Sequence, residues 1–254
     1  DGGRVGADMR VVGVIQARMA SSRLPGKVLM DLCGRPMVIR LWERLSLATL
    51  GGICLVTSRK PENDVLEMMA ARAGLETVQT HPESDVASML LAGADHLGAD
   101  AIIRVTADCP LVDPRLVDAL VTRWVNGREP PGWWDYLSNV WPRRTYPDGL
   151  DLELFSRACL QRLCAAIPLN DLRRSTPNVW IWDHHVGFRI GFMPHTEDLS
   201  WVRWTVDRRD DLDRIRQIWR EMPAGFRWED VPKEHWYREE TIYYEPPKPC
   251  DEAV

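Results

Sequence analysis

The chain has 254 residues with 45% hydrophobic and 27% charged residues, and its formal net charge is −5 at pH 7. These values are typical of a folded soluble protein and exclude a small disulfide-stapled scaffold or a largely disordered chain. The acidic balance argues against non-specific nucleic-acid binding, and no apolar run approaches the roughly 18 residues of a membrane-spanning helix. We therefore expect a cytoplasmic protein that binds neither nucleic acid nor membrane.

The first half of the chain alternates short apolar runs with helical patterns. The runs at 11–15, 53–57 and 101–105 are continuously apolar, as in buried parallel strands. Helices are predicted to begin near Pro36, Asp64, Asp85 and Pro114, where proline or a capping side chain precedes a helical pattern. This alternation predicts an α/β protein with a doubly wound, mostly parallel sheet that binds its ligand at the carboxyl ends of the strands.

The second half is predicted to complete the same sheet. The expected elements are a strand at 149–155, a helix at 156–166, a strand at 201–207 and a helix at 210–222. Trp180 and Trp182 are predicted to alternate on one face of a further strand. The predicted organisation is one domain over 9–222, a disordered extension or tag remnant at 1–8, and an irregular C-terminal wrap and tail at 223–254.

The loop after the first strand carries an unusual concentration of positive charge. Between Met9 and Met30 the sequence holds four cations and no carboxylate, and the cations are Arg10, Arg18, Arg23 and Lys27. Guanidinium groups match phosphate oxygens, and Gly26 before the lysine lets backbone amides approach them. A single arginine would favour a solvated basic loop, but four cations without a carboxylate, three of them directly after a strand, favour a triphosphate-binding loop.

Two familiar phosphate-binding motifs are excluded by the loop sequence. A Walker loop requires glycine and Ser/Thr at the positions that Ser21 and Val28 occupy, and the Gly-x-Gly-x-x-Gly dinucleotide fingerprint is absent.

Two aspartates follow apolar segments and are candidate metal ligands. Asp108 follows the run at 101–105, and Asp207 is the last residue of the predicted strand at 201–207. Each alone is compatible with a helix cap. Together with a phosphate-binding loop they favour magnesium, which takes one or two protein carboxylates plus phosphate and water oxygens.

The sequence resembles the cytidylyltransferases that activate acidic sugars, most closely the spore-coat polysaccharide type related to acylneuraminate and 3-deoxy-manno-octulosonate cytidylyltransferases. The resemblance rests on QARMASSRLPGKVL (16–29), RVTADCPLVDP (104–114), YPDGLDLELFS (146–156) and RWTVDRRDDLDRI (203–215). It implies a three-layer α/β/α Rossmann-like nucleotidyltransferase fold. The implied reaction joins CTP and an acceptor into a CMP-linked product and pyrophosphate.

The resemblance also implies roles for individual residues. The implied CTP-binding set is Gln16, Ala17, Arg18, Ser22, Arg23, Gly26, Lys27, Thr57 and Ser58, with Thr57 and Ser58 at the edge that faces cytosine. Asp108 and Asp207 match the pair that holds Mg²⁺, and with Arg18 and Lys27 they form the implied catalytic set. Asp148, Gly149 and Asp151 fall in the acceptor-side motif. A homodimer formed through part of 133–195 is expected from the resemblance and from the aromatic residues there.

The sequence departs from the family pattern before Thr176-Pro177. Relatives often carry Arg-Glu-His there, whereas this chain has Arg173 and Arg174 followed by Ser175. Either these arginines bind an anionic acceptor, or the segment is a basic surface turn. Asp85 is expected to cap a helix.

Two other functions remain open at this stage. One is a glycosyltransferase that uses a sugar nucleotide, although the Asp-x-Asp motif typical of such enzymes is missing from TADCP. The other is a catalytically idle nucleotide-binding subunit of a polysaccharide pathway.

Overall fold

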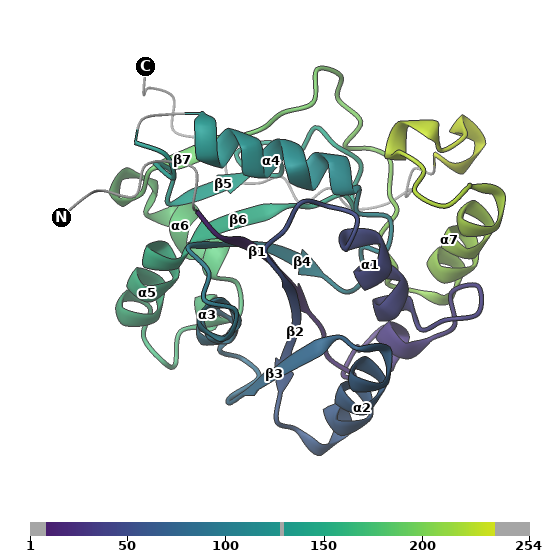
Figure 1. Cartoon of the computed structure of the whole chain (residues 1–254), viewed down its shortest axis with the longest axis horizontal. Coiled ribbons are helices and arrows are strands. Elements are labelled where there is room, and N and C mark those ends of the chain that lie inside the picture. The colour runs from purple at the N-terminus through teal and green to yellow at the C-terminus, as the bar shows by residue number, and fades with distance from the viewer. Residues whose placement is uncertain (1–8, 128–129, 237–254) are drawn as a thin grey trace.

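The computed structural model describes residues 9–127 and 130–236 (Figure 1). Its centre is a seven-stranded sheet in the order β3-β2-β1-β4-β6-β5-β7. The strands are β1 (Val11–Gln16), β2 (Ile53–Ser58), β3 (Glu76–Thr80), β4 (Ala101–Thr106), β5 (Tyr136–Ser138), β6 (Glu153–Ser156) and β7 (Ile190–Phe192). Only β6 runs antiparallel to its neighbours, β4 and β5, so the sheet is mostly parallel, as predicted.

Local capping explains where several helices begin. The α-helices are α1 (Met37–Leu45), α2 (Asp64–Ala73), α3 (Val86–His96), α4 (Pro114–Asn126), α5 (Arg157–Ala166), α6 (Pro177–Asp183) and α7 (Arg209–Glu221). Asp85, Asp113 and Ser156 accept backbone hydrogen bonds at the starts of α3, α4 and α5. In the described part of the chain, no helix combines the length and apolarity needed to cross a membrane.

Helices cover both faces of the sheet and make three layers. On one face, Ile15 and Leu55 of the sheet share a core cluster with residues of α1, α2 and α4. On the other, Val14 and Phe155 pack with residues of α3, α5 and α6. Successive strand residues therefore face opposite helical layers, which explains why the strands are continuously apolar. The predicted three-layer Rossmann-like fold is confirmed.

A third core cluster lies beside the sheet and involves α7. Trp204, Ile215 and Trp228 pack in it together with Leu24 and Leu111, which come from the loops after β1 and β4. The segment after α7 contributes two 3₁₀ turns, η5 (Trp228–Asp230) and η6 (Lys233–His235). The predictions made for 1–8 and for the last residues of the tail lie outside the described residues.

Two predicted strands are wrong. In the described part of the chain, residues 201–207 belong to no strand and form one bridge, between Arg203 and Asp148, and the partner segment turns at Gly149. A Cβ at Gly149 would lie 2.8 Å from the backbone carbon of Trp204, so the turn packs directly on this segment. Trp180 and Trp182 lie on helix α6, which begins with Pro177 at its first position.

Candidate active site

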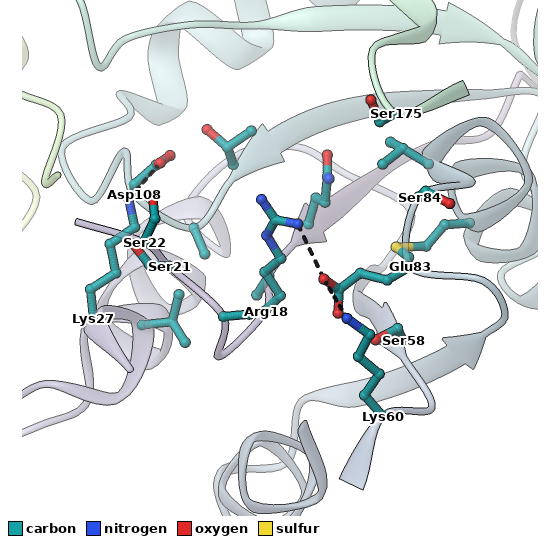
Figure 2. A pocket seen from close by; sticks show the side chains of 18 of the residues that line it. Arg18, Ser21, Ser22, Lys27, Ser58, Lys60, Glu83, Ser84, Asp108 and Ser175 are labelled. Atoms are coloured by element: carbon teal, nitrogen blue, oxygen red, sulfur yellow. Dashed lines mark hydrogen bonds and ion pairs between the residues drawn. The ribbon is translucent and has the colours of Figure 1, made fainter. Parts of the chain in front are cut away.

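A cleft of about 650 Å³ opens at the carboxyl ends of β1, β2 and β4 (Figure 2). Parallel α/β sheets bind their ligands at this edge. The predicted residues that line the cleft are Gln16, Ala17, Arg18, Ser22, Arg23, Lys27, Ser58, Asp108 and Asp207. Segments that are far apart in the sequence are therefore brought to one cavity.

The loop between β1 and α1 is held in shape by hydrogen bonds to its own backbone and to a neighbouring element. The Met19 amide donates to Oδ1 of Asn63 (2.9 Å), and the Gly26 amide donates to the Met19 carbonyl (3.0 Å). Gly26 has φ 70°, a conformation that a residue with a Cβ rarely adopts. Gly26 does not line the cleft but sets the turn that directs Lys27 inward.

Lys27 lies between the two predicted metal ligands. Its Nζ donates to Oδ2 of Asp108 (2.9 Å), to Oδ1 of Asp207 (3.0 Å) and to the carbonyl of Val206 (2.8 Å). An ammonium has three donors, so all of them are used within the protein. The side chain is only 10% exposed. We call the group Lys27, Asp108 and Asp207 the Lys27 end of the cleft.

Arginines provide further positive charge around Asp207. Arg23 lies 2.7 Å from its Oδ1, and Arg203 donates to its Oδ2 (2.6 Å). The Asp207 amide donates to Asp211, which also accepts from Arg203.

For Asp108, burial acts to raise the pKa, but the charge and hydrogen bond of Lys27 outweigh it and hold the pKa below its usual value. Asp108 is therefore ionised at neutral pH.

The carboxylates of the Lys27 end fit the requirements of Mg²⁺. In the described ranges, no group of three His, Cys, Asp or Glu side chains is placed to hold a metal ion. Magnesium, however, needs only one or two carboxylates when a substrate supplies phosphate oxygens. Asp108 and Asp207 already share one cation, the Lys27 ammonium, and both line the cleft.

The opposite end of the cleft contains a carboxylate that sequence reasoning missed. Glu83 follows β3, and Figure 2 shows it beside Ser58 and Lys60, with Arg18 reaching toward it. Its oxygens lie 3.2 Å from Arg18, 3.3 Å from Lys60 and 2.8 Å from the Ser58 hydroxyl. We call the group Ser58, Lys60 and Glu83 the Glu83 end. No sequence motif marked Glu83, because its loop matches no phosphate or metal pattern.

Residues at the carboxyl ends of β1 and β2 have partners within the fold. The Ala17 amide donates to the Val56 carbonyl (3.1 Å), and Oε1 of Gln16 accepts from Nε of Arg104 (3.0 Å). That bond directs the carboxamide nitrogen of Gln16 away from Arg104. Thr57 and Ser58 are both fully buried, but of the two only Ser58 lines the cleft.

The predicted acceptor-side motif lies next to the Lys27 end but does not line the cleft. Asp148 and Asp151 both pair with Arg144, and Asp148 also lies 3.6 Å from Arg203. Burial raises the pKa of Asp148 to about 6; Arg144 opposes the increase, and Asp151 adds to it. Arg203 thus links this motif to Asp207.

The structure gives Arg173 and Arg174 roles other than lining the cleft. Arg174 is buried, and its guanidinium pairs with Asp85 at 2.7 Å. Arg173 pairs with Asp171 and Asp183. Neither arginine lines the described cleft, and their contact with an acceptor stays a prediction. Ser175 and Thr176, which follow them, do line the cleft.

Comparisons with known proteins agree with this geometry. A sequence model of the family described as cytidylyltransferase matches residues 12–143. A 3-deoxy-manno-octulosonate cytidylyltransferase of Parvibaculum lavamentivorans is 38% identical over 109 residues, which is 41% of each chain. The spore coat polysaccharide biosynthesis protein SpsF of Bacillus subtilis is 25% identical over 217 residues, 82% of this chain and 86% of that protein. The chain spans less than half the length of the first two curated relatives it matches.

Solved structures share the fold. A cytidylyltransferase from Leptospira borgpetersenii superposes with a TM-score of 0.84 at 25% identity, over 93% of this chain and 100% of that one. A CMP:2-keto-3-deoxy-manno-octonic acid synthetase solved with CTP gives 0.59 at 21% identity, over 82% and 97%. With the family match over more than half of its residues, the chain belongs to the cytidylyltransferase family.

Proposed function

We propose that this protein is a magnesium-dependent cytidylyltransferase that transfers CMP from CTP to an acidic sugar or a related anionic acceptor and releases pyrophosphate. The observation that carries the proposal is the Lys27 end of the cleft. There a cationic loop meets two carboxylates from segments some 100 residues apart, Asp108 and Asp207. A family relationship to cytidylyltransferases supports the choice of nucleotide.

The residues of the cleft suit an in-line displacement at phosphorus. An acceptor oxygen attacks the α-phosphorus of CTP, the bond to the bridging oxygen breaks, and pyrophosphate leaves with the electron pair. Arg18 and Arg23 extend from the loop that follows β1 and would offset the charge of the departing group. The loop orients the triphosphate, which lowers the entropic part of the barrier. No covalent enzyme intermediate is required.

Lys27 would have to change partners to contact phosphate, because its three donors are already used. Mg²⁺, when bound by Asp108 and Asp207, would supply positive charge to the phosphate oxygens. The charge of Mg²⁺ would replace that of the Lys27 ammonium between the two carboxylates. Lys27 would then become available to the triphosphate. This exchange is part of the proposal.

A pyrophosphate-release assay tests the function directly. The protein is incubated with CTP, Mg²⁺ and a panel of sugar acids, sugar phosphates and phosphonates. We expect release with at least one anionic acceptor and a loss of about 100-fold or more in Asp108→Asn, because asparagine keeps the volume but loses the charge that recruits the metal. Asp64→Asn, an exposed change on α2, is the matched control.

The assay also separates the rival functions. A glycosyltransferase would consume a sugar nucleotide without releasing pyrophosphate, and an idle subunit would bind CTP without turnover. A fully active Asp108→Asn enzyme with normal magnesium dependence would refute the assignment of the metal ligands.

We also propose that the chain forms a homodimer through part of 133–195. Three aliphatic side chains in this region are strongly exposed: Leu169 (82%), Leu172 (88%) and Val186 (92%). Exposed apolar side chains of this kind gather at protein interfaces.

A further inference from the structure

Glu83 is the third acidic side chain that lines the cleft, besides Asp108 and Asp207. It lies at the opposite end from Lys27 and Asp108, with Arg18 between the two ends (Figure 2). Its side chain is only 10% exposed, yet it lines the cavity. It lies apart from the two carboxylates assigned to Mg²⁺, and without a metal ion an acidic group repels a triphosphate, so Glu83 suits another part of the ligand.

The contacts of Glu83 leave part of its hydrogen-bonding capacity unused. Oε1 lies 3.2 Å from Arg18 and 3.3 Å from Lys60, and Oε2 accepts a hydrogen bond from the Ser58 hydroxyl at 2.8 Å. A carboxylate offers about four acceptor positions, so one remains on Oε2. Arg18 and Lys60 are 60% and 47% exposed, and solvent weakens both pairs. Only the Ser58 bond is short and sheltered.

Glu83 remains an acceptor at neutral pH. Burial acts to raise its pKa, but hydrogen bonds from Ser58, Lys60 and Arg18 and the charge of Lys60 hold it below the ordinary value. A group at this end of the cleft therefore meets a carboxylate without a proton to donate.

The environment of Glu83 suits the edge of a flat ring. Val86 and Met89 of α3 line the same cavity and are buried aliphatic side chains. If phosphates occupy the Lys27 end, the base reaches the Glu83 end. Cytosine carries an amino donor at its 4-position, whereas uracil carries a carbonyl acceptor there. A carboxylate accepts a hydrogen bond from the amino group of cytosine. The carbonyl of uracil would instead face the carboxylate as a second acceptor, with no hydrogen between them.

We propose that Glu83 determines the base specificity of this cleft by accepting a hydrogen bond from the exocyclic amine of cytosine and disfavouring uracil. The inference rests on the proposed function, since it assumes that a pyrimidine nucleoside triphosphate occupies the cleft. Ser58 acts as a positioning residue, because its hydroxyl fixes Oε2. Arg18 leaves Glu83 for the triphosphate when the nucleotide binds.

Calorimetric titration with CTP and with UTP, each with Mg²⁺, tests the proposal without turnover. Wild type should bind CTP at least about tenfold more tightly than UTP. With UTP, the hydrogen bond from the cytosine amine to the Glu83 carboxylate is lost and the uracil carbonyl faces that carboxylate instead. In Glu83→Gln the amide can donate to the uracil carbonyl or accept from cytosine, so this ratio should fall at least about fivefold. Glu83→Asp, which keeps the charge but withdraws it by one methylene, should give an intermediate ratio.

Two controls make the result decisive. Glu67→Gln removes an exposed carboxylate of α2 outside the cleft and should leave the ratio unchanged. Inorganic tripolyphosphate has no base, so it reports on the phosphate-binding residues, Arg18 among them, and not on Glu83 as a base acceptor. If Glu83→Gln tightens CTP, UTP and tripolyphosphate equally and keeps the wild-type ratio, Glu83 only restrains Arg18 and the inference is overturned. If wild type binds neither CTP nor UTP, the proposed function fails as well, and the two failures are thus distinguishable.

Discussion

Lys27 shows how one side chain can hold a charged site together before any ligand binds. Its ammonium lies between Asp108 and Asp207, which would otherwise repel each other. We expect Lys27→Met to lower the free energy of unfolding by about 3 kcal/mol, the lower end for breaking a buried pair, because Asp207 keeps Arg23 and Arg203. Urea denaturation without divalent cations measures the change.

The same variant tests whether a metal ion can take the place of the ammonium. Magnesium should restore part of the lost stability of Lys27→Met and should affect wild type less, because only the variant leaves the carboxylate pair without a cation between them. Lys233→Met, an exposed change far along the chain, serves as the control for general salt effects. A magnesium response equal in all three proteins would contradict a shared cation site at Asp108 and Asp207.

Individual residues differed in how well the sequence predicted them. Arg18, Lys27 and Asp108 were recognisable because charge clusters and strand ends leave signals in a linear sequence. Glu83 left none, since its position in the cleft depends on how the loop after β3 folds back toward Ser58. The burial of Arg174 and its pairing with Asp85 could not be predicted, because a buried arginine and a ligand-binding arginine look alike in a sequence.

At the scale of elements, long apolar strands and capped helices were predicted well, and short or polar ones were not. β3 has a single aliphatic residue, Val78, and lies at the edge of the sheet, so it lacks the apolar run used to find strands. β5 and β7 are three residues long, too short for a periodic pattern. The β-forming residues of 180–182 are helical because Pro177 starts the helix and Ile181 is buried on it.

The contact between the turn before α6 and the start of α3 allows a prediction at this scale. Arg174 pairs with Asp85 and also donates to the carbonyl of Cys164 (2.8 Å), which ties three elements together. Arg174→Met should lower the free energy of unfolding by about 3–5 kcal/mol, because it leaves Asp85 buried without its partner. Chemical denaturation measures this loss.

Arg173→Met is the matched comparison, since that arginine is adjacent but 36% exposed, so that solvent weakens its pairs with Asp171 and Asp183. Its stability and its pyrophosphate release should stay close to wild type. A large increase in acceptor KM for Arg173→Met, with stability unchanged, would instead support the original interpretation of this segment as part of the acceptor site.

At the scale of the whole molecule, the cleft depends on the contact between the sheet and the third core cluster. Asp108 follows β4, whereas Asp207 belongs to the segment that packs with α7 beside the sheet. The Val206 amide donates to the Asp108 carbonyl (2.9 Å) and fixes the two parts together. The hydrogen bond between Val206 and Asp108 could not be predicted from the apolar pattern of 201–207, because an extended segment and a sheet strand have the same pattern.

The exposed aliphatic residues near α5 and α6 lead to a prediction about assembly. In Figure 1 these helices lie at the left, away from α1 and α7. Burying Leu172 and Val186 against a second copy would each contribute about 1.5–3 kcal/mol relative to exposure. Light scattering at micromolar concentration should therefore give twice the chain mass of 29.1 kDa. The double variant Leu172→Glu, Val186→Glu should give the monomer mass, because two carboxylates would lose their hydration in the interface.

Leu47→Glu is the control for this experiment, since Leu47 is also an exposed leucine (60%) but follows α1, outside 133–195. It should leave the mass unchanged. Circular dichroism should show that all variants keep the helical content of wild type, so that a change in mass reports association alone. A wild-type protein that elutes and scatters as a monomer at every concentration tested would refute the dimer.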